Sequence, residues 1–263
     1  MGFFTIQPAE FLKIGFVIYM ATLLSGLRHK VKSFRFGLLP ILLIISAISV
    51  ILLLQPDTDT CFIMIVSALA MFTVAGCRFT HLGLIALIGI LMVMALAFYR
   101  PYVMDRFVTL MDPHSDPQGS GYQIWQSLIA VGSGGLIGRG FGQSIQKFEY
   151  LPEPISGSIF AVYAEEFGFI GSSLLICLFT FFTFRGYRIA TTAKDSFGTL
   201  LVVGFVTLIV SQAFLNMAAM LGLMPISGLT LPFISHGGSA LLSTLASVGI
   251  ILNVSKHRRR MVK

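Results

Sequence analysis

Two pairs of ionisable residues lie inside long apolar stretches of the sequence, where a charge is costly and therefore often functional. Glu10 and Lys13 are three positions apart near the start of the first stretch, so they share a helix face and can pair. Glu165 and Glu166 lie within a later stretch, where adjacent side chains point about 100° apart and at most one can face a given cavity fully. A buried structural pair, or a charge that extends to the membrane surface, is the alternative interpretation for all four.

A glycine-rich segment, residues 132–142, could lie against a substrate. Six of its eleven residues are glycine. No Lys-Ser or Lys-Thr follows it and it does not match GxGxxG, so it is not a nucleotide-binding loop. One interpretation is a tight turn with close backbone packing. The other is a flexible rim of a substrate site, in which Arg139 could bind a phosphate.

The composition indicates that these residues belong to a membrane protein. Of the 263 residues, 56% are hydrophobic and 11% are charged, and the mean hydropathy is +0.88. Globular domains contain about 25% charged residues. The difference excludes a water-soluble globular protein, a disordered tail and a nucleic-acid-binding module. Three cysteines, an odd number, argue against a disulfide framework.

Seven stretches are long and apolar enough to cross a bilayer core, which takes roughly 20 helical residues. They are Phe11–Leu27, Phe36–Leu54, Cys61–Gly76, Leu82–Phe98, Ile159–Phe184, Gly198–Leu221 and Gly237–Val254. None resembles a cleavable signal peptide. The sequence therefore predicts an all-α, polytopic membrane protein with about seven transmembrane helices, in which residues 1–263 form a single integral membrane domain.

The basic residues predict the orientation, because loops rich in Lys and Arg remain in the cytoplasm. Placing the first basic cluster, residues 28–35, inside the cell puts most of the 18 basic residues there, including the run Lys256–Lys263. That run is an expected topology anchor, and binding of anionic lipid heads is a compatible second use. The outer side holds most of the acids: Asp57, Asp59, Asp105, Asp112, Asp116, Glu149 and Glu153.

The longest segment without a span, residues 99–158, is expected to be a large extracytoplasmic loop. Connections of this length are usually functional. Within it, Tyr122–Val131 has the pattern of a short amphipathic helix. Proline-rich breaks at residues 55–57, 151–154 and 224–232 fall on the same side and could together rim one outward-facing cavity. This pattern does not distinguish a transporter from an enzyme that acts on a lipid.

A series of short motifs runs in order along the whole chain. They are Gln7–Lys13, Gln55–Asp57, Asp112-Pro113, Asp116-Pro117, Gly121–Gly135, Gly142–Ser144, Gln146–Phe148, Tyr150–Glu153, Ile159–Ala161, Glu165–Gly168, Gly222–Ser235 and Gly237-Gly238. With them the chain resembles the shape, elongation, division and sporulation (SEDS) proteins, whose bacterial members include FtsW and RodA, and it is most like the FtsW type. The resemblance implies a fold of roughly ten spans, of which this chain corresponds to the C-terminal two-thirds.

The resemblance implies a peptidoglycan glycosyltransferase of cell-wall synthesis and cell division, acting on lipid II at the outer face of the bacterial cytoplasmic membrane. An acceptor sugar hydroxyl attacks the anomeric carbon of a donor sugar, and undecaprenyl diphosphate leaves. The reaction needs a carboxylate that takes the hydroxyl proton and cationic groups or a divalent metal at the diphosphate. The implied partners are a class B penicillin-binding protein and other divisome proteins; no nucleic acid is expected.

The resemblance also implies which residues meet the substrate. Arg106, Arg139 and Lys147 are the candidates for the diphosphate, with Lys13 if the cavity reaches into the membrane. The other substrate-binding candidates are Glu10, Gln55, Asp57, Gln123, Gln126, Glu165, Glu166 and Ser235. The sequence contains no spacing typical of metal ligands, so a Mg²⁺ or Mn²⁺ ion would be held mainly by the substrate's phosphates. No other cofactor is expected.

This chain lacks the aspartate proposed as the family's base. Aligning residues 151–153 and 159–161 with the family puts Gly157 at that position, and glycine cannot accept a proton. Three explanations stay open: the chain is inactive but assembles with its partners, Glu153 or Asp59 replaces the aspartate, or the glycine is an engineered or erroneous residue. Two rival functions also stay open, a flippase for lipid II, which needs no base, and a noncatalytic divisome scaffold.

Overall fold

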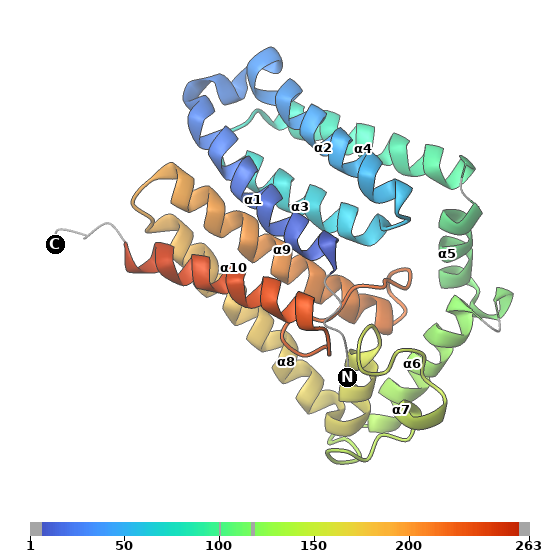
Figure 1. The fold of residues 1–263 in the computed structure, drawn as a ribbon. Coiled ribbons are helices and arrows are strands. Elements are labelled where there is room, and N and C mark those ends of the chain that lie inside the picture. Colours follow the sequence, from blue (N-terminus) through green and yellow to red (C-terminus); the bar gives the residue numbers. More distant parts are fainter. Residues whose placement is uncertain (1–6, 100, 117–118, 258–263) are drawn as a thin grey trace. The chain divides into compact units, whose positions relative to one another are not determined.

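The computed structural model describes residues 7–99, 101–116 and 119–257, and within these ranges it contains helices and no β-strand. Figure 1 shows α1 (Pro8–Leu27), α2 (Leu39–Leu54), α3 (Thr58–Val74), α4 (Phe79–Tyr99), α5 (Pro101–Met111), α6 (Ser120–Gly134), α7 (Gln146–Glu149), α8 (Ile159–Thr191), α9 (Ser196–Met220) and α10 (Gly238–Lys256). Short helical turns, η1 (Arg28–Lys32), η2 (Phe34–Leu38) and η3 (Pro113–Ser115), connect some of them. The predicted all-α fold is confirmed.

Five segments of the described chain are long and apolar enough to cross a membrane: Pro8–Leu27, Phe34–Leu54, Ile159–Thr191, Ser196–Met220 and Gly238–Lys256. They correspond to five of the seven expected spans. The other two correspond to α3, which has 17 residues, and to α4, whose side chains are described continuously only through Gly89. The multi-pass character is therefore confirmed, and the count of seven stays a prediction.

The segment expected as a long loop, residues 99–158, contains helical structure of its own. The amphipathic helix predicted at Tyr122–Val131 is the central part of α6. The Asp116 carboxylate stabilises the N-terminal end of this helix, because it accepts hydrogen bonds from the backbone N–H groups of Gly119 (3.0 Å) and Ser120 (2.8 Å). The helix ends at Gly135, whose φ of 55° lies in the left-handed region that glycine tolerates.

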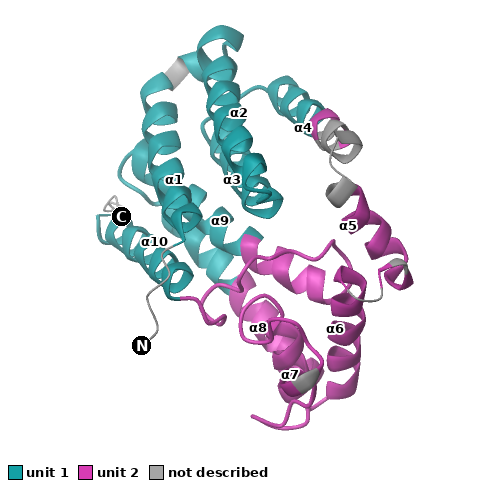
Figure 2. Cartoon of the chain, turned by 45° about the vertical axis from the view of Figure 1, so that its right-hand side comes forward, with its two compact units in different colours: residues 1–89, 181–211, 238–263 teal, residues 90–180, 212–237 magenta. Residues whose placement is uncertain are grey.

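The chain forms two compact units (Figure 2). Unit 1 comprises residues 1–89, 181–211 and 238–263, and unit 2 comprises residues 90–180 and 212–237. Each unit has its own apolar core. Met20, Phe72 and Phe205 are buried in unit 1, while Phe160 and Met217 are buried in unit 2. Helices α4, α8 and α9 each contain residues of both units. The single domain expected over residues 1–263 stays a prediction.

Candidate functional site

Asn216 of α9 holds together two loops of unit 2, the 151–158 loop and the 224–237 loop. Its side-chain amide donates to the carbonyl oxygens of Gly157 and Leu229, both at 2.7 Å, and the residue has no exposed surface. A buried amide that makes two such bonds is costly to replace, because its partners would lose their donors inside the protein. Asn216 therefore fixes the backbone at the position of the family's aspartate.

Three further hydrogen bonds fasten the same loops. The Ser235 hydroxyl donates to the carbonyl of Ser156 (2.7 Å), and the backbone N–H of His236 donates to the carbonyl of Ile155 (2.8 Å). Gln212 donates to the carbonyl of Thr230 (2.8 Å). Among the sequence candidates, Ser235 thus contributes to the organisation of the site.

Gln212 and Asn216 are two residues of this site that were not among the candidates predicted from the sequence. Two polar residues four positions apart inside an apolar helix lie on one face and need partners. Both residues find those partners in loop backbone. The signal was present in the spacing, whereas the partners depend on how the loops fold back.

Gly157 is buried, and its backbone leaves room for a side chain. Its φ lies outside the left-handed region, and the first atom that an added Cβ would meet is Glu153 Oε2, at an ordinary contact distance of 3.5 Å. Glu153 is exposed and adopts a left-handed φ of 48°. The Glu153 carbonyl accepts hydrogen bonds from the N–H groups of Ser156 (3.1 Å) and Ser158 (3.2 Å). This turn brings the Glu153 carboxylate close to Gly157.

The other unit 2 candidates contribute to this region unequally. Gln123 of α6 donates to the Ser158 hydroxyl (2.9 Å), which in turn donates to the carbonyl of Pro152 (2.7 Å). Gln123 therefore braces the 151–158 loop. Gln126 is half-buried on α6, and Arg106 is half-buried on α5.

The glycine-rich segment fills a break in α8. Gly168 has a φ of 64°, which interrupts the helix. The segment bonds to the helix backbone on both sides of the break: Arg139 N–H to Glu165 O (3.0 Å), Gly140 N–H to Glu166 O (3.0 Å), Phe169 N–H to Gly135 O (2.8 Å) and Ile170 N–H to Leu136 O (3.1 Å). This geometry supports the interpretation as close backbone packing, and it satisfies backbone groups that the break would otherwise leave unpaired.

Glu165 and Glu166 both contact the segment that follows the glycines, despite pointing in different directions. The fully buried Glu165 carboxylate accepts from the Ser144 hydroxyl (2.5 Å) and from the backbone of Ile145 (3.2 Å), and it lies 3.5 Å from Arg139 Nε. The Glu166 carboxylate pairs with Lys147 Nζ at 2.7 Å. Ser144, at which the sequence analysis placed no role, anchors this network.

These pairs change the interpretation of two basic candidates. The charges of Arg139 and Lys147 are balanced by Glu165 and Glu166. Lys147 Nζ also donates to the carbonyl of Gly142 (3.0 Å). Beside the pairs is a hollow of about 280 Å³ lined by Gly142, Gln143, Ser144, Ile145, Phe148 and Tyr150. The two cations therefore hold loop structure in addition to any role toward a phosphate.

We expect Gly134→Ala to destabilise the protein and Gly132→Ala to leave it unchanged or slightly more stable. A Cβ at Gly134 would collide with the backbone of Ala164 and Glu165, while a Cβ at Gly132 meets nothing within 4 Å. Overpacking of this kind costs about 1 to 3 kcal/mol, whereas alanine at an unhindered helix position gains up to about 1 kcal/mol. Thermal unfolding of both purified variants measures the difference. Equal melting temperatures would contradict the packing described for α6 and α8.

The remaining candidates lie in unit 1. Glu10 and Lys13 form the ion pair expected from their spacing, with 2.7 Å between Oε1 and Nζ. Ser243 of α10 donates to the other Glu10 oxygen (2.6 Å), so this buried group joins α1 to α10. Gln55 is exposed at the end of α2, and the Asp57 carboxylate caps α3 by accepting from the Thr60 N–H (3.1 Å).

The structure thus brings the candidates together in separate groups. Unit 1 holds Glu10, Lys13, Gln55 and Asp57, and unit 2 holds Arg106, Gln123, Gln126, Arg139, Lys147, Glu153, Gly157, Glu165, Glu166 and Ser235. Within unit 2 the proline-rich breaks at residues 151–154 and 224–232 belong to loops that are bonded to each other. The single cavity expected to be rimmed by all three breaks, including residues 55–57 of unit 1, stays a prediction.

Comparison with a family profile and with individual known proteins leads to the same family. A sequence profile described as a cell cycle protein, covering FtsW, RodA and SpoVE, matches residues 1–260. The stage V sporulation protein E of Bacillus subtilis (strain 168) is 44% identical over 259 residues, which are 98% of this chain and 71% of that protein. A probable peptidoglycan glycosyltransferase FtsW of Geobacter sp. (strain M18) is 40% identical over 259 residues, which are 97% of this chain and 70% of that protein.

Solved structures show the same similarity. A chain from a peptidoglycan synthase complex, studied for its coordination of polymerization and crosslinking, superposes with a TM-score of 0.79 at 27% identity and covers 99% of this chain and 73% of its own. The rod shape determining protein RodA of Thermus thermophilus superposes with a TM-score of 0.65 at 28% identity, covering 97% of this chain and 67% of its own. Both sequence and fold therefore agree with the resemblance that the motifs indicated.

Proposed function

Because the chain belongs to the family of FtsW, RodA and SpoVE cell cycle proteins, we propose that it is a peptidoglycan glycosyltransferase that acts on lipid II in cell-wall synthesis and division. Relatives carry the name of probable peptidoglycan glycosyltransferase, and a similar solved chain comes from a peptidoglycan synthase complex. The observation that carries the proposal is the 151–158 loop, which is fixed by Asn216 and presents the Glu153 carboxylate beside Gly157.

The proposed reaction joins two sugars. An acceptor hydroxyl of one lipid-linked glycan attacks the anomeric carbon of the donor, a new C–O bond forms, and the bond to the diphosphate oxygen breaks. The hydroxyl proton goes to a carboxylate, and the electron pair of the broken bond leaves with undecaprenyl diphosphate. Among the described side chains, Glu153 is the carboxylate that lies beside the position of the family's aspartate, and its exposure supports a role as proton acceptor.

The leaving diphosphate needs positive charge. Arg106 is one proposed contact, and Arg139 and Lys147 are others to the extent that they can exchange their carboxylate partners for phosphate. Among the described residues there is no group of three or more His, Cys, Asp or Glu side chains that could hold a metal. A Mg²⁺ or Mn²⁺ ion would therefore be held mainly by the substrate's phosphates, where it would stabilise the leaving charge.

The proposed setting is the bacterial cytoplasmic membrane. The chain is a multi-pass membrane protein, and the excess of Lys and Arg at the ends assigned to the cytoplasm supports an extracytoplasmic position for the 151–158 loop. A class B penicillin-binding protein, which would supply the crosslinking step, is the proposed partner, together with other divisome proteins. The similarity to a chain from a complex that coordinates polymerization and crosslinking supports this pairing.

We expect Glu153→Gln to lower polymerisation of lipid II by about 100-fold or more, since a base of this kind contributes factors of that order. The substitution leaves an oxygen that can still accept the Ser156 hydroxyl, which bonds Glu153 Oε2 at 2.8 Å. Glycan polymer made from lipid II by the purified chain with its penicillin-binding partner is the readout. Asp59→Asn is the matched control. If Asp59→Asn loses activity and Glu153→Gln does not, the base is Asp59.

A further inference from the structure

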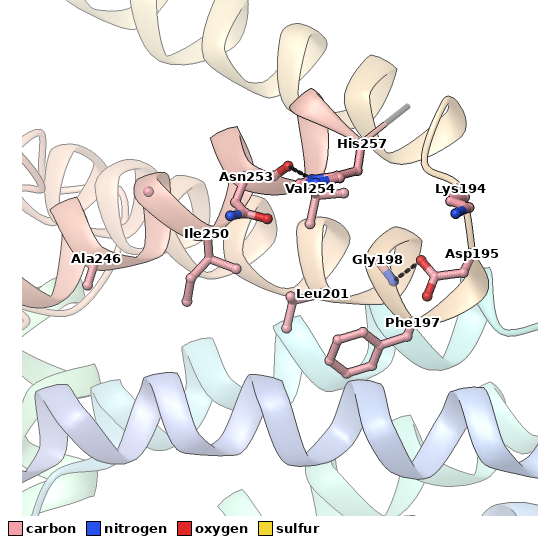
Figure 3. A pocket seen from close by; sticks show the side chains of 11 residues that line it. Lys194, Asp195, Phe197, Gly198, Leu201, Ala246, Ile250, Asn253, Val254 and His257 are labelled. Atoms are coloured by element: carbon pink, nitrogen blue, oxygen red, sulfur yellow. Dashed lines mark hydrogen bonds between the residues drawn. The ribbon is translucent and has the colours of Figure 1, made fainter. Parts of the chain in front are cut away.

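A groove in unit 1 lies between the start of α9 and the second half of α10 (Figure 3). Its volume is about 520 Å³, which is within the size range of ligand pockets. None of the residues proposed for the glycosyltransferase reaction lines it. Its lining includes Phe197, Leu201, Ala246, Ile250, Asn253 and His257.

The lining changes from apolar to polar along α10. Ala246 and Ile250 line one end, and Asn253 and His257, with Val254 between them, follow toward the other. Ala246 and His257 are eleven positions apart, which is roughly 16 Å along a helix. That distance is about half of the roughly 30 Å hydrocarbon core of a bilayer, the depth of one leaflet. The groove therefore has the length and polarity gradient of a single phospholipid molecule.

The polar end of the groove carries an excess of positive charge. Lys194 is exposed and forms no ion pair with any described residue. The neighbouring Asp195 is engaged in capping α9, where its carboxylate accepts the Gly198 N–H at 3.1 Å. Lys256 adjoins His257, so the described residues at this end carry two cations, Lys194 and Lys256, against the one carboxylate of Asp195. This charge is complementary to an anionic headgroup.

We propose that the groove binds one anionic phospholipid of the cytoplasmic leaflet. The phosphate lies at the polar end, where Lys194 supplies charge and Asn253 supplies an amide donor. An acyl chain runs along α10 past Gly249 and Ala246. In the proposed orientation of the chain, α10 ends in the cytoplasm. The polar end of the groove then lies at the level of the lipid headgroups, and the apolar end lies inside the cytoplasmic leaflet. The inference rests on that orientation and not on glycosyltransferase activity.

Two variants test the two ends of the groove separately. Lys194→Ala removes the charge, and Lys32→Ala is its control, because Lys32 is exposed in η1, outside the groove, and its removal changes the net charge equally. Gly249→Leu fills the apolar end. A Cβ at Gly249 meets nothing within 4 Å, and leucine favours a helix more than glycine does, so this variant is expected to fold normally.

The experiment is native mass spectrometry of the purified chain titrated with phosphatidylglycerol, or with phosphatidylcholine of the same acyl chains. We expect one phosphatidylglycerol to be retained more strongly than phosphatidylcholine. Lys194→Ala should weaken its retention about fivefold, Gly249→Leu should abolish it, and Lys32→Ala should leave it unchanged. Equal retention of both lipids, equal losses in the two lysine variants, or undiminished binding by Gly249→Leu would each overturn the proposal. Lipid binding needs no enzymatic turnover, so an inactive polymerase would not affect the result.

Discussion

Gly157→Asp is expected to raise polymerisation of lipid II by up to about 100-fold over the level that Glu153 supports, because it returns a carboxylate to the position of the family's proposed base and a well-placed base contributes about 10² to 10⁴ in total. The backbone there accepts a side chain, since its φ is not left-handed and the first contact of a Cβ is at 3.5 Å. Asn216 bonds the carbonyl of residue 157, and this bond does not depend on the side chain. The measurement is glycan polymer formed from lipid II by the purified variant and the unchanged chain, each with its penicillin-binding partner.

The isosteric Gly157→Asn variant is the control for this gain. It adds nearly the same volume beside Glu153 but cannot act as a carboxylate base, so only the aspartate should increase polymer formation. If the unchanged chain already polymerises as fast as Gly157→Asp, the assignment of the base to position 157 is wrong. Reconstituted chains that move lipid II between leaflets without forming polymer, in either variant, would favour the flippase. Normal complexes with no effect of Gly157→Asp in cells would favour the scaffold.

The largest loss of stability is expected from Lys13→Met. The Lys13 side chain is buried and lies 2.7 Å from Glu10, whose other oxygen accepts the Ser243 hydroxyl. Removing the lysine leaves a carboxylate in surroundings that exclude water, and breaking a buried pair from one side costs about 3 to 5 kcal/mol. Thermal unfolding of the purified chain in detergent measures this effect.

The double variant Glu10→Gln with Lys13→Met distinguishes a lost charge partner from lost packing. Without the carboxylate no buried charge remains, and the amide oxygen can still accept from Ser243. Most of the lost stability should therefore return in the double variant. A double variant as unstable as Lys13→Met would show that the lysine acts mainly through its packing.

The sequence predicted the features that depend on local spacing. The Glu10–Lys13 pair follows from a separation of three positions on a helix, and it is present. Five of the predicted spans follow from length and hydropathy. The glycine-rich segment was expected to pack closely or to turn tightly, and it does pack against α8. The ion pair and the apolar helices depend on residues near one another in the chain, and the packing of the glycine-rich segment follows from its local glycine content.

Features that join distant segments could not be predicted in the same way. Glu165 and Glu166 were recognised as unusual, but their partners Ser144 and Lys147 belong to another segment. The break at Gly168 has no local signal, because a lone glycine is tolerated within a helix. Helix α5 was not expected, although its start at Pro101 and its amphipathic sequence are typical of a helix. The separation of the candidates into two units has no counterpart in the motif order.

The interruption of α8 has a consequence for how the polypeptide enters the bilayer. Backbone groups of Glu165, Glu166, Phe169 and Ile170 find their partners in residues 135–140, which are synthesised earlier. Before those residues dock, the same four groups can pair with one another in an unbroken helix, since Phe169 follows Glu165 and Ile170 follows Glu166 by four positions. Docking of residues 135–140 therefore exchanges two helical hydrogen bonds for four, and this stretch is expected to enter the bilayer as a straight helix that breaks at Gly168 afterwards.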